Sequence, residues 1–228
     1  YIYSMDPSLA EEIIRYREQL GTSNWNLDIK TLVTVLAYRL TNSAVLANFK
    51  EYIISVRRSN SIEQERRKIR DEWGKAKRGV EYAKVLLGSE LGIRNSRYLP
   101  SEPAFRTLAT VYSYMERGVI NPRKIAYWFV LASIHRRYTG ATEYRMTEDI
   151  KKFIEVLRNN DEDHAIKVLV DNIERQIGRI EISEEDFIRN DKFTRSLLYL
   201  ALHENNARDP EQGTRISDLS VTDFHHIF

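Results

Sequence analysis

The sequence contains no cysteine, and it is poor in proline and glycine, with five and nine residues among 228. The absence of cysteine excludes a disulfide framework, a thiolate zinc site and a cysteine nucleophile. It is also compatible with a reducing cytoplasm, which is the expected location. With so little Pro and Gly and with 42% hydrophobic residues, the chain is not collagen-like, of low complexity or wholly disordered.

Long apolar runs and a strong net charge are lacking as well. No run of about 18 apolar residues is present, so we expect no membrane span. The 35 Lys and Arg residues nearly balance the 33 Asp and Glu residues, which leaves a formal net charge of +2. Such a balance argues neither for nor against a nucleic-acid partner, because only a local patch could decide that. A Gly-rich phosphate loop is also absent.

Neither end of the sequence has the features of a complete chain. The start, Tyr1 to Asp6, has neither an initiator Met nor a signal-peptide pattern. The end stops on the apolar residue Phe228 without a polar tail. We therefore expect a piece of a longer protein.

Apolar residues recur at the spacing of one helix face along most of the chain. This pattern predicts an all-α fold, an irregular multi-helix array or bundle of about nine or ten helices that ends in a short extended segment. Three regions are expected. They are a helical lobe with a long charged helix over 1–92, a second helical lobe over 93–206, and a loop with one strand over 207–228.

The second lobe carries three further expectations. The helix over about 122–135 is apolar nearly all round, which predicts a buried central helix. His135 within it is interpreted as a packed or hydrogen-bonded residue rather than a ligand. Arg136 and Arg137 follow as cations that complement the negative end of that helix. Another helix is expected to start at about residue 147.

The stretch over 61–91 is long and highly charged, with a narrow heptad-like apolar seam. Five cations fall on one broad side of this expected helix: Arg66, Arg67, Arg70, Lys77 and Arg78. One interpretation is a stripe that contacts DNA phosphates. The other, which is more common for such helices, is an ordinary solvated face with pairs such as Glu63–Arg67.

One short segment suggests a reaction, the terminal hexapeptide Asp223-Phe224-His225-His226-Ile227-Phe228. Its pattern is typical of a strand, in which neighbouring residues point to opposite faces. A divalent cation needs oxygen or imidazole ligands, and a hydrolytic water needs a base that titrates near neutrality, for which His is suited. Adjacent side chains can fill both roles only where the strand bends. The alternative is a chance pair of His residues on an exposed strand.

The hexapeptide closely resembles the opening of the HNH nuclease motif, and the chain is similar to ParB-like/HNH restriction endonucleases of the GmrSD type. The lead-in is also similar, with an apolar helix over 196–202, then Asn206-Ala207-Arg208-Asp209, a glycine and a short strand. Those bacterial proteins join an N-terminal nucleotide-dependent ParB-like domain, a helical middle and a C-terminal HNH nuclease. The resemblance covers 100–228 more closely than 1–99, and it implies a helical middle region that runs into the HNH motif.

The resemblance also implies a role for each matching residue. His226 would be the general base, His225 a metal ligand and Asp223 a nearby polar residue. The parent protein would hydrolyse DNA phosphodiester bonds with a divalent metal such as Mg²⁺, and no cofactor is expected on this chain alone. The later Asn and last His of the motif and the ParB-like motifs are not in this sequence, so the chain alone is expected to be inactive.

Two functions from different classes follow. In the first, the chain connects and positions the N-terminal nucleotide-dependent domain and the C-terminal nuclease domain of a restriction enzyme, with basic contacts to DNA. In the second, it is a non-enzymatic helical scaffold that binds a protein partner or RNA. A reading frame that continues after Phe228 with Pro, then Asn and His, favours the first function, and one without these residues favours the second.

Overall fold

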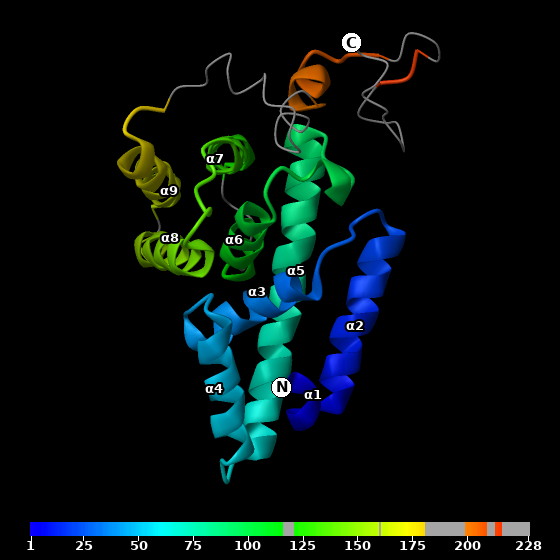
Figure 1. Ribbon diagram of the computed structural model, residues 1–228, viewed down its shortest axis with the longest axis vertical. Coiled ribbons are helices and arrows are strands. Elements are labelled where there is room, and N and C mark those ends of the chain that lie inside the picture. Colours follow the sequence, from blue (N-terminus) through cyan, green and yellow to red (C-terminus); the bar gives the residue numbers. More distant parts are fainter. Residues whose placement is uncertain (116–120, 160, 181–198, 209–212, 216–228) are drawn as a thin grey trace.

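The fold was analysed in a computed structural model, which describes residues 1–115, 121–159, 161–180, 199–208 and 213–215 (Figure 1). These residues form α-helices and one 3₁₀ helix without a strand, which confirms the all-α prediction. The helices are α1 (Ile2–Met5), α2 (Pro7–Thr22), α3 (Ile29–Thr41), α4 (Leu46–Arg57), α5 (Ile62–Leu91), η1 (Ser96–Tyr98), α6 (Glu102–Ser113), α7 (Pro122–Ile134), α8 (Thr142–Leu157) and α9 (Glu162–Ile177). Residues 199–204 are helical as well. The extended segment expected near the C-terminus lies outside the described residues.

Most helix starts follow local capping signals. The side chains of Asp6, Ser101 and Asp161 accept hydrogen bonds from backbone N–H groups in the first turns of α2, α6 and α9. At the other end of α5, Gly92 adopts the left-handed conformation that commonly ends a helix. Because such signals involve only neighbours in sequence, the bounds of these helices were predictable.

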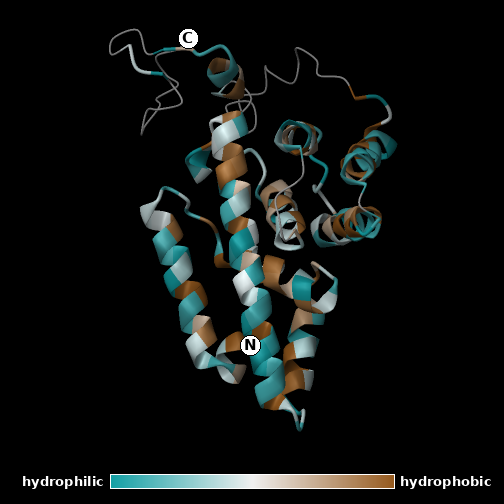
Figure 2. Ribbon diagram, turned by 180° about the vertical axis from the view of Figure 1, so that it is seen from behind, coloured by the Kyte–Doolittle hydropathy of each residue, from teal (hydrophilic) through white to brown (hydrophobic). Residues whose placement is uncertain are grey.

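The 30-residue helix α5 runs along the whole structure and joins two groups of helices. In Figure 1, α1, α2 and α4 lie along its lower half, and α6 to α9 lie beside its upper half. The helix α3 crosses between the two groups and packs on both α5 and α6. Each of the helices α1 to α9 in the described part of the chain contributes buried residues to one hydrophobic cluster. Hydrophilic and hydrophobic residues alternate along α5 (Figure 2), as expected for a helix that buries one side.

The central helix of the second group is α6, not α7 as the sequence predicted. Every residue from Ala104 to Ser113 is buried, and α6 packs against α3, α5, α7 and α8. By contrast, Tyr127 on α7 is 57% exposed. α7 is itself buried over most of its length, but α6 is buried more completely although it contains polar residues. The hydroxyls of Thr107 and Thr110 donate to carbonyl oxygens one turn earlier, at 3.0 and 2.7 Å, so they can be buried.

Two glycines within α5 have opposite surroundings. A Cβ atom on Gly79 would lie 2.2 Å from the carbonyl oxygen of Ala109 in α6, whereas a Cβ atom on Gly74 would meet nothing within 4 Å. The absence of a side chain at Gly79 therefore lets the backbones of α5 and α6 approach closely. No helix in the described part of the chain is long and apolar enough to cross a membrane.

A charged junction joins α3, α5 and α6. Arg39 on α3 donates to the Glu72 carboxylate on α5 and, at 2.6 Å, to the backbone oxygen of Ser113 at the end of α6. Lys75 also donates to Glu72, at 2.5 Å. Burial raises the pKa of Glu72, but the hydrogen bonds and charges of Lys75 and Arg39 outweigh burial and hold this pKa below its ordinary value.

This lowered pKa predicts a loss of stability in acid. A carboxyl with a lower pKa in the folded state stabilises the fold above its unfolded pKa, and that contribution is lost as the pH falls through the folded pKa. We expect the urea midpoint to fall between about pH 6 and about pH 3.5, and to fall less in Glu72→Gln. An equal pH dependence in both proteins would contradict the role of Glu72.

Candidate functional site

The residues of the predicted nuclease motif, Asp223, His225 and His226, lie outside the described residues. Their roles and the metal site therefore stay predictions. The structure does describe residues 199–208, which lead toward them, and it shows how this lead-in helix is held. No group of three or more side chains that could hold a metal ion occurs in the part of the chain that the structure describes.

The lead-in helix is fixed to the end of α5 by aromatic contacts. Tyr199 is 2% exposed, and its hydroxyl donates to the backbone oxygen of Gly92 at 2.7 Å. Its ring stacks on that of Tyr98 in η1, with centroids 4.4 Å apart and planes 7° apart. Such a pair combines aromatic packing with a satisfied polar group. The start of the lead-in helix is therefore held by two separate contacts.

The next turn of the lead-in helix packs against the same glycine. Gly92 has φ +66°, and a Cβ atom there would lie 2.4 Å from Nδ1 of His203. The backbone N–H of Ala207 then donates to the oxygen of Leu202 at 2.9 Å, which closes the helix. Gly92 thus serves two purposes, because it ends α5 and leaves room for the imidazole of His203. We call Gly92, Tyr98, Tyr199 and His203 the lead-in clamp.

Three of the five cations predicted on one side of α5 bind groups on other parts of the fold. Arg70 binds both carboxylate oxygens of Asp6 at 2.7 and 2.9 Å. Lys77 donates to Glu12 at 2.6 Å. Arg66 donates to the backbone oxygen of Met5 at 2.7 and 3.0 Å, and to Glu63 at 2.6 Å. These three cations hold α1 and α2 against α5, so their positions are explained by the fold.

The other two cations of the stripe, Arg67 and Arg78, are exposed and form no ion pair with the described residues. The expected pair Glu63–Arg67 is not formed, because Glu63 pairs with Arg66 instead. Neither sequence interpretation anticipated that α2 would lie beside this helix. Contact with DNA along the stripe stays a prediction, and of its five cations Arg67 and Arg78 are the two without an ion pair to the described residues.

A buried ionic network that the sequence did not reveal joins the turn after α7 to α8 and α9. Asp149 in α8 is fully buried and accepts two hydrogen bonds from Arg137, at 2.8 and 3.1 Å. It also accepts from the Tyr138 hydroxyl at 3.0 Å and from the side-chain amide of Asn172 at 2.7 Å. Arg137 in turn donates to Gln176 on α9 at 2.9 Å. We call these residues the Asp149 network.

Arg137 follows the end of α7, as expected, but its side chain is only 6% exposed because it binds the buried Asp149. The helix expected to start at about residue 147 begins at Thr142, where no side chain caps the N-terminus, so no local signal marked it. His135 is the C-cap residue of α7 and is half-buried, and its interpretation as a packed residue stays a prediction.

The Asp149 network has the chemistry of a structural unit rather than a catalytic one. Burial lowers the pKa of Arg137, but the hydrogen bonds and charge of Asp149 outweigh burial and raise this pKa above its ordinary value. Burial together with the Asp149 charge raises the pKa of Tyr138 well above its ordinary value. Both groups therefore keep their protons, and four donors occupy the two oxygens of Asp149.

Comparisons with protein-family models, with curated proteins and with solved structures found no match for this chain. What the protein does is therefore inferred from its own residues and their geometry. Two features bear on function. They are the lead-in clamp, which holds the segment before the predicted motif, and the distribution of cations over the surface.

Proposed function

We propose that this chain is the helical scaffold of a cytoplasmic, bacterial restriction-type DNA endonuclease. In the parent protein, an HNH domain whose loop and first strand lie over 207–228 would hydrolyse DNA phosphodiester bonds with a divalent metal such as Mg²⁺. The hexapeptide over 223–228 supports this proposal by its resemblance to the HNH motif. The lead-in clamp supports it structurally, because the helix that precedes the hexapeptide is fixed to the end of the longest helix of the fold.

The proposed chemistry assigns one proton transfer to this chain. His226 would accept a proton from the attacking water, since an imidazole near neutral pH can both accept and release a proton. His225 would hold the metal ion, and Asp223 would lie nearby as a polar residue. When bound, the metal ion would act as a Lewis acid on the scissile phosphate.

The helical part would contribute position rather than chemistry. A general base acts efficiently only when it is held close to its productive geometry, and such residues are best placed on rigid elements. Tyr199 and His203 pack on the end of α5, and α5 packs on α6 and α3 in the core. The segment that carries the motif would therefore leave the scaffold from a fixed point.

The proposal is tested by DNA cleavage with a chain that continues through the predicted nuclease domain, in the presence of Mg²⁺. His226→Ala is expected to lower the cleavage rate by about 10²-fold or more, since it removes the general base. Gln64→Ala is the control, because Gln64 is exposed on α5 and should cut like the wild type. Equal cleavage rates for His226→Ala and wild type would show that His226 is not the general base.

The second function, a non-enzymatic scaffold for a protein partner or RNA, predicts a different result. In that case the wild-type chain would not cut DNA with Mg²⁺ at all. Its reading frame would also continue without the Pro, Asn and His that complete the HNH motif. Cleavage by the wild type that depends on His226 therefore distinguishes the two functions.

A further inference from the structure

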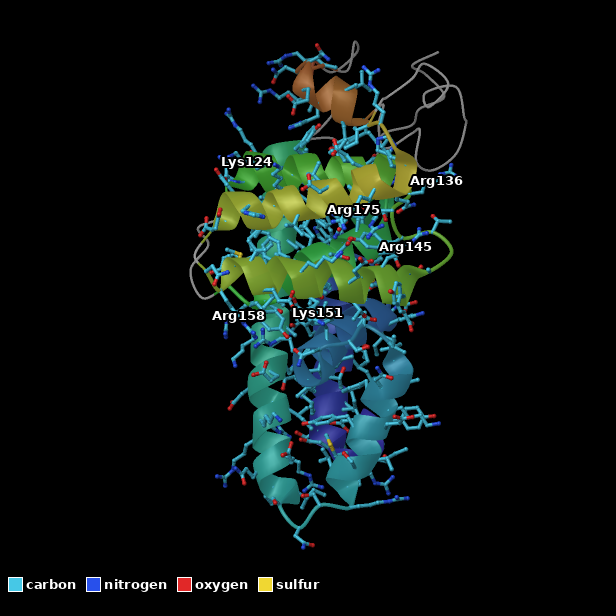
Figure 3. All side chains as sticks on the ribbon, turned by 90° about the vertical axis from the view of Figure 1, so that its left-hand side faces the viewer. Lys124, Arg136, Arg145, Lys151, Arg158 and Arg175 are labelled. Carbon is cyan, nitrogen blue, oxygen red and sulfur yellow. The ribbon has the colours of Figure 1, made fainter. Side chains whose placement is uncertain are left out.

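Cationic side chains gather on the outer surface of α7, α8 and α9. Figure 3 shows six of them on one face, two near each end of the helices and two in the middle: Lys124, Arg136, Arg145, Lys151, Arg158 and Arg175. They come from all three helices and the turn after α7. We call this surface the α7–α9 face. It lies on a part of the structure distinct from the stripe on α5 that the sequence singled out.

Two arginines of the face are held by neutral acceptors. Arg145 donates to the backbone oxygens of Arg137 and Thr139, both at 2.9 Å. Arg175 donates to the side-chain oxygen of Asn172 at 2.5 Å and to the backbone oxygen of Asp171 at 3.3 Å. These contacts orient the guanidinium groups without cancelling their charge. The arginines of α5 differ, because Arg70 is neutralised by a carboxylate.

Three other cations of the face are unpaired or weakly paired. Arg158 is exposed and forms no ion pair with any residue that the structure describes. Lys151 lies 3.9 Å from Glu155, and both side chains are more than half exposed. Lys124 lies 2.6 Å from the exposed Asp163. Exposed pairs of this kind contribute little stability, so a phosphate group can replace the carboxylate as the partner of the lysine.

Several carboxylates of residues 121–180 bind other groups of the fold. Residues 121–180 contain 11 Lys and Arg against 9 Asp and Glu. Asp149 is buried on Arg137, Glu148 binds Lys152 at 2.6 Å, and Asp161 caps α9. Setting aside these three carboxylates and the two cations that they bind, Arg137 and Lys152, leaves nine cations against six carboxylates over 121–180.

A cleft with an exposed aromatic ring lies at one end of the face. It has a volume of about 490 Å³, and Lys124, Tyr127, Asp163, His164 and Lys167 form its polar and aromatic walls over Ile166 and Val170. Tyr127 is 57% exposed. Aromatic rings beside lysines are a combination that contacts the sugar and phosphate of nucleic acids. This cleft extends the face beyond Lys124.

We propose that the α7–α9 face binds the phosphate backbone of double-stranded DNA. The 16 residues of α8 span about 24 Å, which corresponds to about seven base pairs of a duplex. Lys151 and Arg158 lie along this length, and Arg175 lies on the neighbouring helix. The inference rests on the proposed function for the choice of DNA as partner, and it adds the surface that holds it.

The test compares two double variants of the chain 1–228 that change the net charge equally. Lys151→Glu with Arg158→Glu alters the α7–α9 face, and Arg67→Glu with Arg78→Glu alters the exposed cations of α5. Binding to a fluorescent DNA duplex of about 20 base pairs is measured by anisotropy from about 50 to about 200 mM salt. We expect the first variant to bind about tenfold or more weakly, with a salt slope reduced by about two. The α5 variant should bind within about twofold of the wild type.

Other outcomes overturn the inference. If both double variants bound DNA equally weakly, the effect would be one of net charge alone. Unchanged DNA binding by the first variant would show that the α7–α9 face does not bind DNA. Preference of the wild type for RNA or for anionic lipid vesicles would assign the cations to another partner. Because binding needs neither metal nor His226, a chain continued through the predicted nuclease domain that binds DNA through this face but never cuts it with Mg²⁺ would refute the proposed nuclease, while the binding face would remain supported.

Discussion

Replacing Gly79 by Ala is expected to destabilise the protein by about 3 kcal/mol, at the upper end of what overpacking usually costs. The new Cβ atom would lie 2.2 Å from the carbonyl oxygen of Ala109, and 2.8 Å from the backbone nitrogen and Cβ of Ser113. These atoms belong to α6, which is buried along its length. Relief therefore requires α5 and α6 to move apart, which disturbs the packing of the core.

The effect is measured as the free energy of unfolding in urea, with Gly74→Ala as the matched control in the same helix. A Cβ atom on Gly74 would meet nothing within 4 Å, so alanine is expected to stabilise α5 by about 0.5–1 kcal/mol. The two substitutions make the same chemical change and differ only in surroundings. Changes of the same sign at both positions would contradict the close approach of α5 and α6.

Removal of the Asp149 carboxylate is expected to lower the free energy of unfolding as much as Gly79→Ala does, or more. Asp149→Ala leaves the Arg137 guanidinium, whose side chain is 6% exposed, with only the more distant Glu148 carboxylate at 3.7 Å. It also leaves the hydroxyl of Tyr138 and the amide of Asn172 without their acceptor. Breaking a buried ion pair on one side typically costs about 3–5 kcal/mol, because the remaining charge is left uncompensated.

Two further variants separate this charge effect from simple loss of side-chain volume. Replacing both partners, with Arg137→Met and Asp149→Leu, should recover most of the lost stability, since no buried charge remains. Glu155→Ala removes an exposed carboxylate from the same helix, and we expect a change of less than about 0.5 kcal/mol. A double variant as unstable as Asp149→Ala would show that the network does not act through its charges.

The bounds of several helices could be predicted from the sequence because they depend on neighbouring residues. Asp6 and Pro7 mark the start of α2, Asp161 marks the start of α9, and Gly92 ends α5. Such caps act within one turn, and the apolar spacing that predicts an amphipathic helix also repeats over a few residues. At Ala141 before α8, where no side-chain cap is present, the predicted start was wrong.

In contrast, the tertiary structure decided which charged side chains find a partner. Arg67 and Arg70 are three residues apart in α5 and look alike in the sequence, yet only Arg70 reaches Asp6 on the neighbouring segment. Arg137 finds Asp149 in the next helix and Gln176 in α9. Likewise, the clamp on the lead-in helix joins residues 107 positions apart.

The sequence by itself therefore determined that the chain is helical, where most of its helices begin and end, and which hexapeptide resembles a nuclease motif. The tertiary structure decided which cations are neutralised, which remain on the α7–α9 face, and which helix occupies the centre. The physical reason lies in the range of the interactions. Capping and helix periodicity act between residues close in sequence, whereas burial and ion pairing depend on residues that only the folded chain brings together.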